Sequence, residues 1–239
     1  THGPAPGDPY FAKAPERPFL DEVGRDPGKL RIALMTAPPD GRAVDDACVT
    51  ETRKAATLCE SLGHTIEGAG PAFDFEGMLQ AIRVVVCGSV GFGTETRLHA
   101  LDREWRQGDV ENITKTWAEE GASYSARDFA EAVFTLHQVA RDFGAFFEDY
   151  DVLLSPTLGR VPMKLGERPM DGTDLDAYYA HQCDIIPFTT PYNAAGAPAI
   201  SLPLGWSADG LPVGVQFGAA MGNEGLLLRL ASQIETAAP

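Results

Sequence analysis

Two stretches of this sequence carry residue types that could do chemistry. The first, Cys87-Gly-Ser-Val-Gly91, combines a thiol and a hydroxyl with glycines. A serine hydrolase of the nucleophile-elbow type needs Gly-x-Ser-x-Gly where a strand turns into a helix, and the first glycine here stands one position late. This stretch therefore does not predict a serine nucleophile of that type.

Cys87 could act as a nucleophile itself if the fold brought a histidine beside it. No local signature ties this thiol to a histidine, so the sequence does not favour a cysteine nucleophile. Four histidines stand at some distance along the chain: His64, His99, His137 and His181.

The glycines around Cys87 could also suggest a phosphate-binding loop. Gly88, Gly91 and Gly93 are not followed by Gly-Lys-Ser/Thr, and no lysine stands between Lys54 and Lys115 to reach a phosphate. We expect instead a glycine-rich turn in which one backbone segment approaches another.

The four cysteines do not predict a disulfide or a metal site. Cys48 and Cys59 fall in one expected helix, where eleven residues separate their Cα atoms by roughly 16 Å, too far for a bridge. The sequence has no close Cys-x-x-Cys pair, and His181-Gln-Cys183 is a weak signal. We expect no metal and no cofactor, with Cys48 and Cys59 as reduced core residues.

Composition limits the partners. The 239 residues include 19 basic and 34 acidic side chains, a formal charge of −15, so nucleic acid and anionic membranes would be repelled. We find no contiguous apolar run near the ~20 residues of a membrane span and no signal peptide, and we expect a cytoplasmic protein. The chain begins with Thr1 rather than methionine, which suggests a processed chain or a piece of a longer one.

The first elements that could position these residues alternate between strand and helix. Leu30 to Met35 is a short apolar run that predicts a strand. A helix follows from Val44 to Leu62, ending at Gly63, and Thr65-Ile66 begins another extended segment. This order favours an α/β layer.

A second helix is clearer. Ser125 and Asp128 offer a capping box at its start, and Asp151 to Thr157 directly after it predicts a buried strand. The apolar residues that recur at helical spacing, and that we expect to be core, are Phe129, Val133, Leu136, Ala140, Phe143, Phe147 and Tyr150.

The last third predicts a cover, a hairpin and a helix. Residues 159–176 are rich in Gly, Pro and charge, as in a surface excursion over a pocket, and 175–183 predicts a short helix with Tyr178 and Tyr179. Alternating apolar residues on both sides of Ser207-Ala-Asp-Gly210 predict a β-hairpin. Asn223 is expected to cap a final helix.

The second stretch that could do chemistry, PFTTPYNAAGAPAISLPLG at residues 187–205, looks like one wall of a pocket. Taken with Asp151-Val-Leu-Leu-Ser-Pro-Thr157 before it and Gly210-Leu-Pro-x-Gly-x-Gln216 after it, it resembles the C-terminal half of the amidase signature family. Gly7-Asp8-Pro9 and Leu30 to Met35 resemble that family more loosely.

The resemblance implies an α/β fold, the C-terminal portion of the amidase signature fold, with a mixed β-sheet covered by helices on both faces. Residues 1–29 carry many Pro and Gly and lack periodicity, which predicts a linker, and residues 30–239 would then be the C-terminal part of the amidase domain. Family members hydrolyse amides through a serine nucleophile, a second serine in a cis peptide and a lysine base, all upstream of the part that this chain resembles. We therefore expect no catalytic residue in this chain, and expect an N-terminal portion of the same amidase as its partner.

The resemblance also suggests pocket residues. Phe188, Thr189 and Asn193 are the members of the 187–205 stretch expected to reach an amide substrate, while its prolines and Gly196 support the backbone. Cys87 resembles a pocket-lining cysteine of the branch that includes 6-aminohexanoate cyclic-dimer hydrolases, beside the alternative of an inert thiol.

Other functions stay open. The chain could be a non-catalytic remnant or a module that binds a partner, and it could form a homodimer. Within the family, the A subunit of a glutamyl-tRNA amidotransferase fits less well, because a charge of −15 gives no sign of a tRNA surface. Which amide is cleaved cannot be read from the residues.

Overall fold

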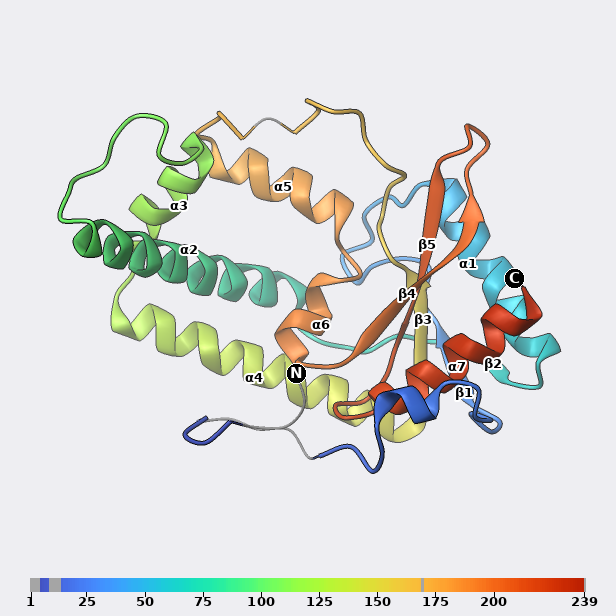
Figure 1. Ribbon diagram of the computed structural model, residues 1–239. Helices are drawn as coiled ribbons and strands as arrows, with labels where there is room; N and C mark the ends of the chain where they lie inside the picture. Colours follow the sequence, from blue (N-terminus) through green and yellow to red (C-terminus); the bar gives the residue numbers. More distant parts are fainter. Residues whose placement is uncertain (1–4, 9–13, 169, 239) are drawn as a thin grey trace.

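The computed structural model describes residues 5–8, 14–168 and 170–238, so Pro9 of the Gly7-Asp8-Pro9 segment and Lys13 lie outside the described residues. Helices gather on one side of the molecule and the sheet with its two flanking helices on the other (Figure 1). The elements are η1 (Phe19–Glu22), β1 (Arg31–Leu34), α1 (Asp46–Ser61), β2 (Thr65–Gly68), α2 (Phe75–Ala100), α3 (Asn112–Gly121), α4 (Ala126–Asp149), β3 (Val152–Pro156), α5 (Leu175–Ile185), α6 (Thr190–Ala195), β4 (Ala199–Trp206), β5 (Pro212–Gly218) and α7 (Glu224–Ala237).

The five strands form one mixed sheet in the order β2-β1-β3-β5-β4. β1 runs parallel to β2 and to β3, whereas β5 is antiparallel to both β3 and β4. The parallel pairs come from strand, helix and strand connections, and the antiparallel pair of β4 and β5 is the predicted hairpin. The expected mixed sheet is confirmed.

Each central strand sends alternate side chains into two separate cores. Ile32 of β1 lies in one core and Ala33 in the other, and Leu154 and Leu153 of β3 divide in the same way. Successive side chains of a strand point to opposite faces, so a continuous apolar run means that both faces are buried. The central strands β1 and β3 therefore need short, continuous apolar runs rather than an alternation of polar and apolar residues.

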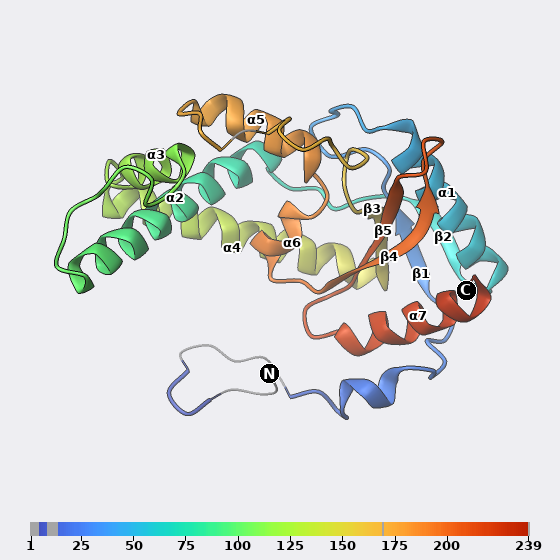
Figure 2. The ribbon, with the colours of Figure 1, turned by 45° about the horizontal axis from the view of Figure 1, so that its top comes forward.

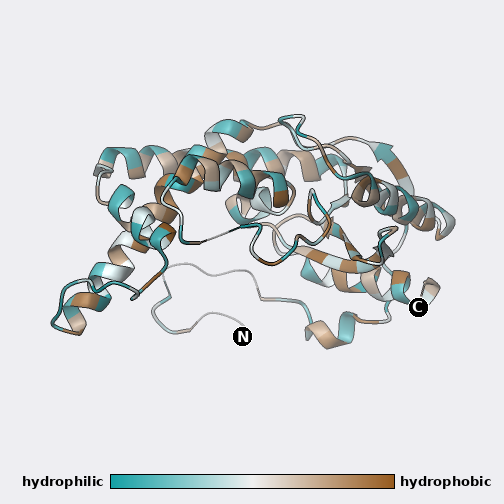
Figure 3. Cartoon of the chain, turned by 90° about the horizontal axis from the view of Figure 1, so that it is seen from above, coloured by the Kyte–Doolittle hydropathy of each residue, from teal (hydrophilic) through white to brown (hydrophobic). Residues whose placement is uncertain are grey.

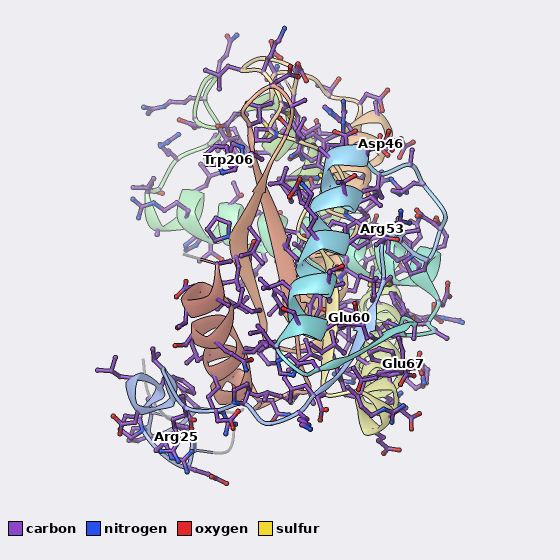
Figure 4. All side chains as sticks on the ribbon, turned by 90° about the vertical axis from the view of Figure 1, so that its right-hand side faces the viewer. Arg25, Asp46, Arg53, Glu60, Glu67 and Trp206 are labelled. Carbon is purple, nitrogen blue, oxygen red and sulfur yellow. The ribbon has the colours of Figure 1, made fainter. Side chains whose placement is uncertain are left out.

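Helices cover both faces, as the resemblance implied. α1 and α7 lie over one face and complete the core around Phe217 (Figure 4). On the other face α4, α6 and the start of α2 pack around Phe143 and Met78 (Figures 1 and 2). Polar and apolar residues alternate along the long helices, as expected for helices with one face in a core (Figure 3).

Most of the expected elements are present. α1 ends before Gly63, whose φ of +94° is one that glycine adopts readily. The side chain of Ser125 accepts from the backbone of Asp128, whose carboxylate accepts in return, so the capping box that begins α4 is confirmed. Cys48 and Cys59 are buried and free.

Two details of the helices differ from expectation. Phe129, the first residue of the predicted stripe, is 45% exposed, whereas Phe143 is buried and Leu136, Phe147 and Tyr150 pack against the same core. Asn223 precedes α7 as expected, but its side chain makes no capping hydrogen bond there. In both cases packing against neighbouring elements, rather than local pattern, decides the outcome.

The predicted glycine-rich turn is wrong, because Gly88, Gly91 and Gly93 all lie inside α2. The expected close approach of backbones does occur: a Cβ on Gly91 would stand 3.2 Å from the carbonyl oxygen of Ala118 in α3. Each glycine lowers the stability of a helix by up to ~1 kcal/mol relative to alanine, so the sequence pattern does not indicate a helix here. Tertiary contact with α3 and α4 overrides that cost.

α2 is also long and apolar enough, by length and composition, to span a membrane. The expectation that the sequence has no contiguous apolar run of this length stands, because polar residues such as Arg83 interrupt α2, and it is the average hydropathy over the helix that is high. In the fold the helix packs against α3 and α4 and faces a cleft with its remaining apolar side chains.

The segment before β1 is fastened to the far end of the chain. Glu22 of η1 is 6% exposed, and its carboxylate lies 2.8 Å from Arg17 Nη1 and 3.5 Å from Arg229 Nε of α7. Gly24 N–H donates to the hydroxyl of Ser232, also on α7. A domain boundary near residue 29 stays a prediction.

The contact between α2 and α3 gives a test. A Cβ on Gly121 would overlap the carbonyl oxygen of Cys87, so we expect Gly121→Ala to lower the free energy of unfolding by about 1–3 kcal/mol. Gly93→Ala in α2 is the control: a Cβ there meets nothing within 4 Å, and helix propensity should raise stability by up to ~1 kcal/mol. Urea denaturation measures both, and equal effects would contradict the close packing.

Candidate functional site

A cleft of about 550 Å³ lies between α2, α5 and α6. One side is an apolar wall. α2 supplies most of this wall because its residues at helical spacing turn the same side toward α5. The apolar lining residues are Leu79, Ile82, Val85, Val86, Leu136, Ala180, Ile186 and Ala194.

A few polar groups line the same cleft. Asn193 of α6 is exposed and can both donate and accept a hydrogen bond. The hydroxyl of neighbouring Thr190 already donates to the carbonyl of Ile186 at 2.8 Å. An apolar wall with a few convergent polar groups is the usual composition of a small-molecule site.

Of the four predicted site residues, Asn193 lines this cleft. Phe188 is 1% exposed, and its carbonyl oxygen accepts from Gln216 Nε2 at 3.1 Å. Thr189 is half-buried and its hydroxyl lies 3.4 Å from the carbonyl of Ile186. The lining of the cleft does not include Phe188 or Thr189.

Cys87 lies directly behind the cleft lining. It is fully buried, and its Sγ is 3.6 Å from the hydroxyl of Tyr179, which does line the cleft. Burial raises the pKa of the Cys87 thiol, with Tyr179 opposing the shift. The thiol is therefore protonated at neutral pH, and its described hydrogen-bond partners, Tyr179 and Glu120, include no histidine.

Arg83 of α2 joins three helices at one end of the cleft. Its Nε and Nη2 donate to the two carboxylate oxygens of Glu120 in α3 at 2.5 and 2.6 Å, and its Nη1 donates to Asp176 in α5 at 2.5 Å. The guanidinium also lies 5.1 Å from the centre of the Tyr179 ring. Bidentate pairing of this kind fixes the orientation of the guanidinium in addition to pairing its charge.

The carboxylate of Glu120 accepts hydrogen bonds from Arg83, Tyr124 and Cys87. Arg83 holds the pKa of Glu120 below its usual range, and the Tyr124 hydroxyl, which donates to Glu120 at 2.5 Å, acts in the same direction. Burial and then Glu120 raise the pKa of Tyr124. Sequence reasoning missed this network, because Arg83 and Glu120 are 37 positions apart in helices that were not predicted.

A second polar group lies on the sheet. The hydroxyls of Thr157 and Ser201 are 2.6 Å apart, and a Cβ on Gly214 would press on both. Close by, Gln216 Nε2 is 3.4 Å from the Ser155 hydroxyl. On the edge strand β4, which carries Ser201, the alternate residues Ala199, Ser201 and Pro203 are exposed, so no described helix covers this face of β4.

The described residues hold no obvious base or metal site. Four lysines, Lys29, Lys54, Lys115 and Lys164, are all exposed, whereas a lysine base needs burial to become neutral. His64 is engaged between Leu30 N–H and Gln233. Among the described residues no group of three His, Cys, Asp or Glu side chains could hold a metal ion.

The ion pair of Arg83 predicts an acid dependence. A carboxylate with a lowered pKa contributes fully above its unfolded value of about 4.3, and its contribution is lost as the pH falls through the folded value. We expect Glu120→Gln to lower the free energy of unfolding by about 1–3 kcal/mol at pH 7. The difference in unfolding free energy between the unsubstituted chain and the variant should become smaller below about pH 4.

The neighbouring Glu119→Gln serves as the control in urea denaturation at several pH values. Glu119 is mostly exposed and lies 3.6 Å from Lys115, so its substitution should change stability little at any pH. A Glu120→Gln gap of the same size at low and at neutral pH would contradict the assignment.

Comparison with known proteins relates this chain to a family. A family model described as Amidase matches residues 1–228. The chain is 34% identical over 245 residues to the 6-aminohexanoate-cyclic-dimer hydrolase of Paenarthrobacter ureafaciens, covering 99% of this chain and 50% of the relative. This chain therefore spans about half the length of the curated relatives it matches.

Solved structures agree. A structure of 6-aminohexanoate cyclic dimer hydrolase superposes with a TM-score of 0.91 at 33% identity, over 99% of this chain and 51% of that one. A bacterial aryl acylamidase of the amidase signature enzymes gives a TM-score of 0.73 at 20% identity, over 92% of this chain and 46% of that one, a likeness of fold alone.

A glutamyl-tRNA(Gln) amidotransferase structure from Thermotoga maritima gives a lower TM-score of 0.64 at 25% identity, over 91% of this chain and 44% of that one. The family model and the sequence identity to the hydrolase both cover nearly the whole chain, and the fold agrees with them. This chain therefore belongs to the Amidase family.

Proposed function

We propose that this chain is the C-terminal half of an amidase and contributes one wall of the pocket in which a carboxamide bond is hydrolysed. The serine nucleophile, the second serine and the lysine base come, in this proposal, from an N-terminal portion. The observation that carries it is the match itself, which runs along 99% of this chain but only half of the relative.

The burial and the pKa shifts of the described side chains support a catalytic centre that lies outside the described residues. The four described lysines are exposed, so none has the buried environment that a neutral lysine base requires. The thiol of Cys87 has a raised pKa and no histidine among its described partners, which is the reverse of an activated nucleophile.

The open side of the sheet supports a docking place for the N-terminal portion. β4 is an edge strand, and its exposed alternate residues Ala199, Ser201 and Pro203 are small. Exposed edges of this kind are normally paired or covered. A portion that added to this edge would stand beside the polar pair of Thr157 and Ser201.

The cleft suggests how the substrate is held. The apolar wall of α2 would take the carbon chain of a small linear or cyclic amide, and Asn193 would hydrogen-bond to its polar group. The nucleophilic oxygen would attack the carbonyl carbon, expel the amine and leave an acyl-enzyme, which water then hydrolyses to the acid. Phe188 and Thr189 would support this wall from behind, and Cys87 would support Tyr179.

Within the family, the fold favours the hydrolase branch over the amidotransferase. The TM-score is 0.91 to 6-aminohexanoate cyclic dimer hydrolase and 0.64 to the amidotransferase, over similar shares of this chain. The strongly acidic composition also gives no basic surface for tRNA.

The partner can be tested directly by size-exclusion chromatography with light scattering and intact mass analysis of the protein from its natural source. We expect a second polypeptide of similar size to co-elute and the complex to hydrolyse amides. A folded 239-residue chain that elutes alone and inactive would overturn the proposal in favour of a non-catalytic module, and a chain that elutes only with itself would indicate a homodimer.

The role of Asn193 can be tested in the active complex. Asn193→Ala removes the amide that lines the cleft, and we expect kcat/KM for amide hydrolysis to fall about tenfold, the loss of one hydrogen bond to substrate. Asn223→Ala is a matched control, because the Asn223 side chain makes no capping bond and lies before α7. Equal activities of the two variants would exclude Asn193 from the pocket.

A further inference from the structure

α5 crosses the cleft and forms one of its sides. Tyr179, Ala180, Gln182 and Cys183 of this helix all line the cleft, opposite the apolar wall of α2. Figures 1 and 2 show α5 beside α2 on the side away from α4. Any ligand that fills the cleft therefore lies between these two helices.

The C-terminal end of α5 is fixed to the sheet region by the backbone. Gly159, which follows β3, donates its N–H to the carbonyl of Ile185 at 2.9 Å, and a Cβ on Gly159 would stand 2.5 Å from the carbonyl oxygen of Asp184. The Asp184 carboxylate also lies 2.9 Å from Arg42 Nη1. Backbone contact this close makes this end the natural pivot.

The N-terminal end of α5 is held mainly through side chains. Asp176, in the first turn, pairs with Arg83 of α2, and Tyr178 packs edge-on against Trp117 of α3 at 5.2 Å between ring centres. The loop before the helix is tied to α3, where Ile113 N–H donates to the carbonyl of Met170. The first turn itself is joined to α2 by the charge pair.

Arg83 is held in place independently of that pair. Two of its nitrogens are bound by Glu120, so the guanidinium cannot follow Asp176 if α5 moves. Asp176 is 85% exposed on its side chain, whereas Arg83 and Glu120 are each 21% exposed. Water can replace Arg83 at Asp176 far more easily than at Glu120.

Cys87 lies beneath the same end of α5. It is fully buried, and the Tyr179 hydroxyl 3.6 Å from its Sγ is part of what covers it. Lifting the first turns of α5 would remove Tyr179 and expose the thiol. The reactivity of Cys87 therefore reports the position of α5.

From this arrangement we propose that α5 is a lid on the cleft, pivoting at its C-terminal end near Gly159 and held closed at its N-terminal end by the pair of Arg83 and Asp176. A small, largely apolar ligand would enter when the lid lifts and be enclosed when the pair re-forms. The identity of that ligand as an amide rests on the proposed function; the movement of the lid does not.

The test is the alkylation rate of each cysteine in the whole chain, measured by peptide mass spectrometry with iodoacetamide at one pH. We expect Asp176→Asn to speed alkylation of Cys87 about two- to fivefold, the effect of losing one exposed ion pair. Cys59 reports global opening, because it is fully buried on the inner face of α1 in the other core, and its alkylation rate should not change.

Asp184→Asn is the matched control on the same helix. It removes the charge at the pivot, where Arg42 keeps its second carboxylate, Asp40, and the backbone bond to Gly159 remains. We expect this substitution to change the alkylation rate of Cys87 less than about twofold. Sodium chloride at about 1 M should mimic Asp176→Asn in the unsubstituted chain, because it screens the exposed pair.

Two results would overturn the lid. The first is an equal acceleration of Cys87 by both substitutions, which would mean general loosening of α5. The second is a Cys87 rate that follows the Cys59 rate in every variant, which would mean that Cys87 is reached only by global unfolding. Neither readout depends on amide hydrolysis. The expected labelling pattern in a chain that elutes alone and inactive from its natural source would therefore contradict the proposed function and leave the lid standing.

Discussion

The complete burial of β3 is the constraint on which the rest of the structure depends. All five of its residues are buried, with Leu153 in one core and Val152 and Leu154 in the other. A strand buried on both faces must have neighbours on both sides and helices above and below. β3 accordingly joins the parallel part of the sheet to the antiparallel hairpin, and a helical layer lies on each face.

The cleft depends on the second helical layer. α2 and α3 approach so closely that a side chain at Gly121 would overlap the backbone of α2, and a Cβ at Gly91 would stand only 3.2 Å from the carbonyl oxygen of Ala118. The opposite side of α2 therefore faces α5 across the cleft. The space between α2 and α5 is not filled by side chains, and polar bonds around Arg83 hold its edge. An apolar cleft bordered by a charged network has the composition of a small-molecule site, as the proposed function requires.

The strands, α1, α4, the hairpin and α7 could all be predicted, because their apolar residues follow the period of the element that they form. α2 could not, because its four glycines and a run of valines have low helix propensity, and its stability comes from contact with α3 and α4. Of the residues predicted for the site, Asn193 lines the cleft, and its role in binding stays a prediction. The partners of Cys87 lie 33 and 92 positions away, and no local pattern links them.

The sequence by itself determined the alternation of strands and helices, the capping box of α4 and the family, since each depends on residue types at short spacing or on a long ordered set of motif residues. Only the tertiary structure decided that Arg83, Glu120 and Asp176 meet, that Cys87 is covered by Tyr179, and that β4 keeps an exposed face. The physical reason is that charge pairing and burial depend on distance in space, which the order of residues does not specify until the helices have packed.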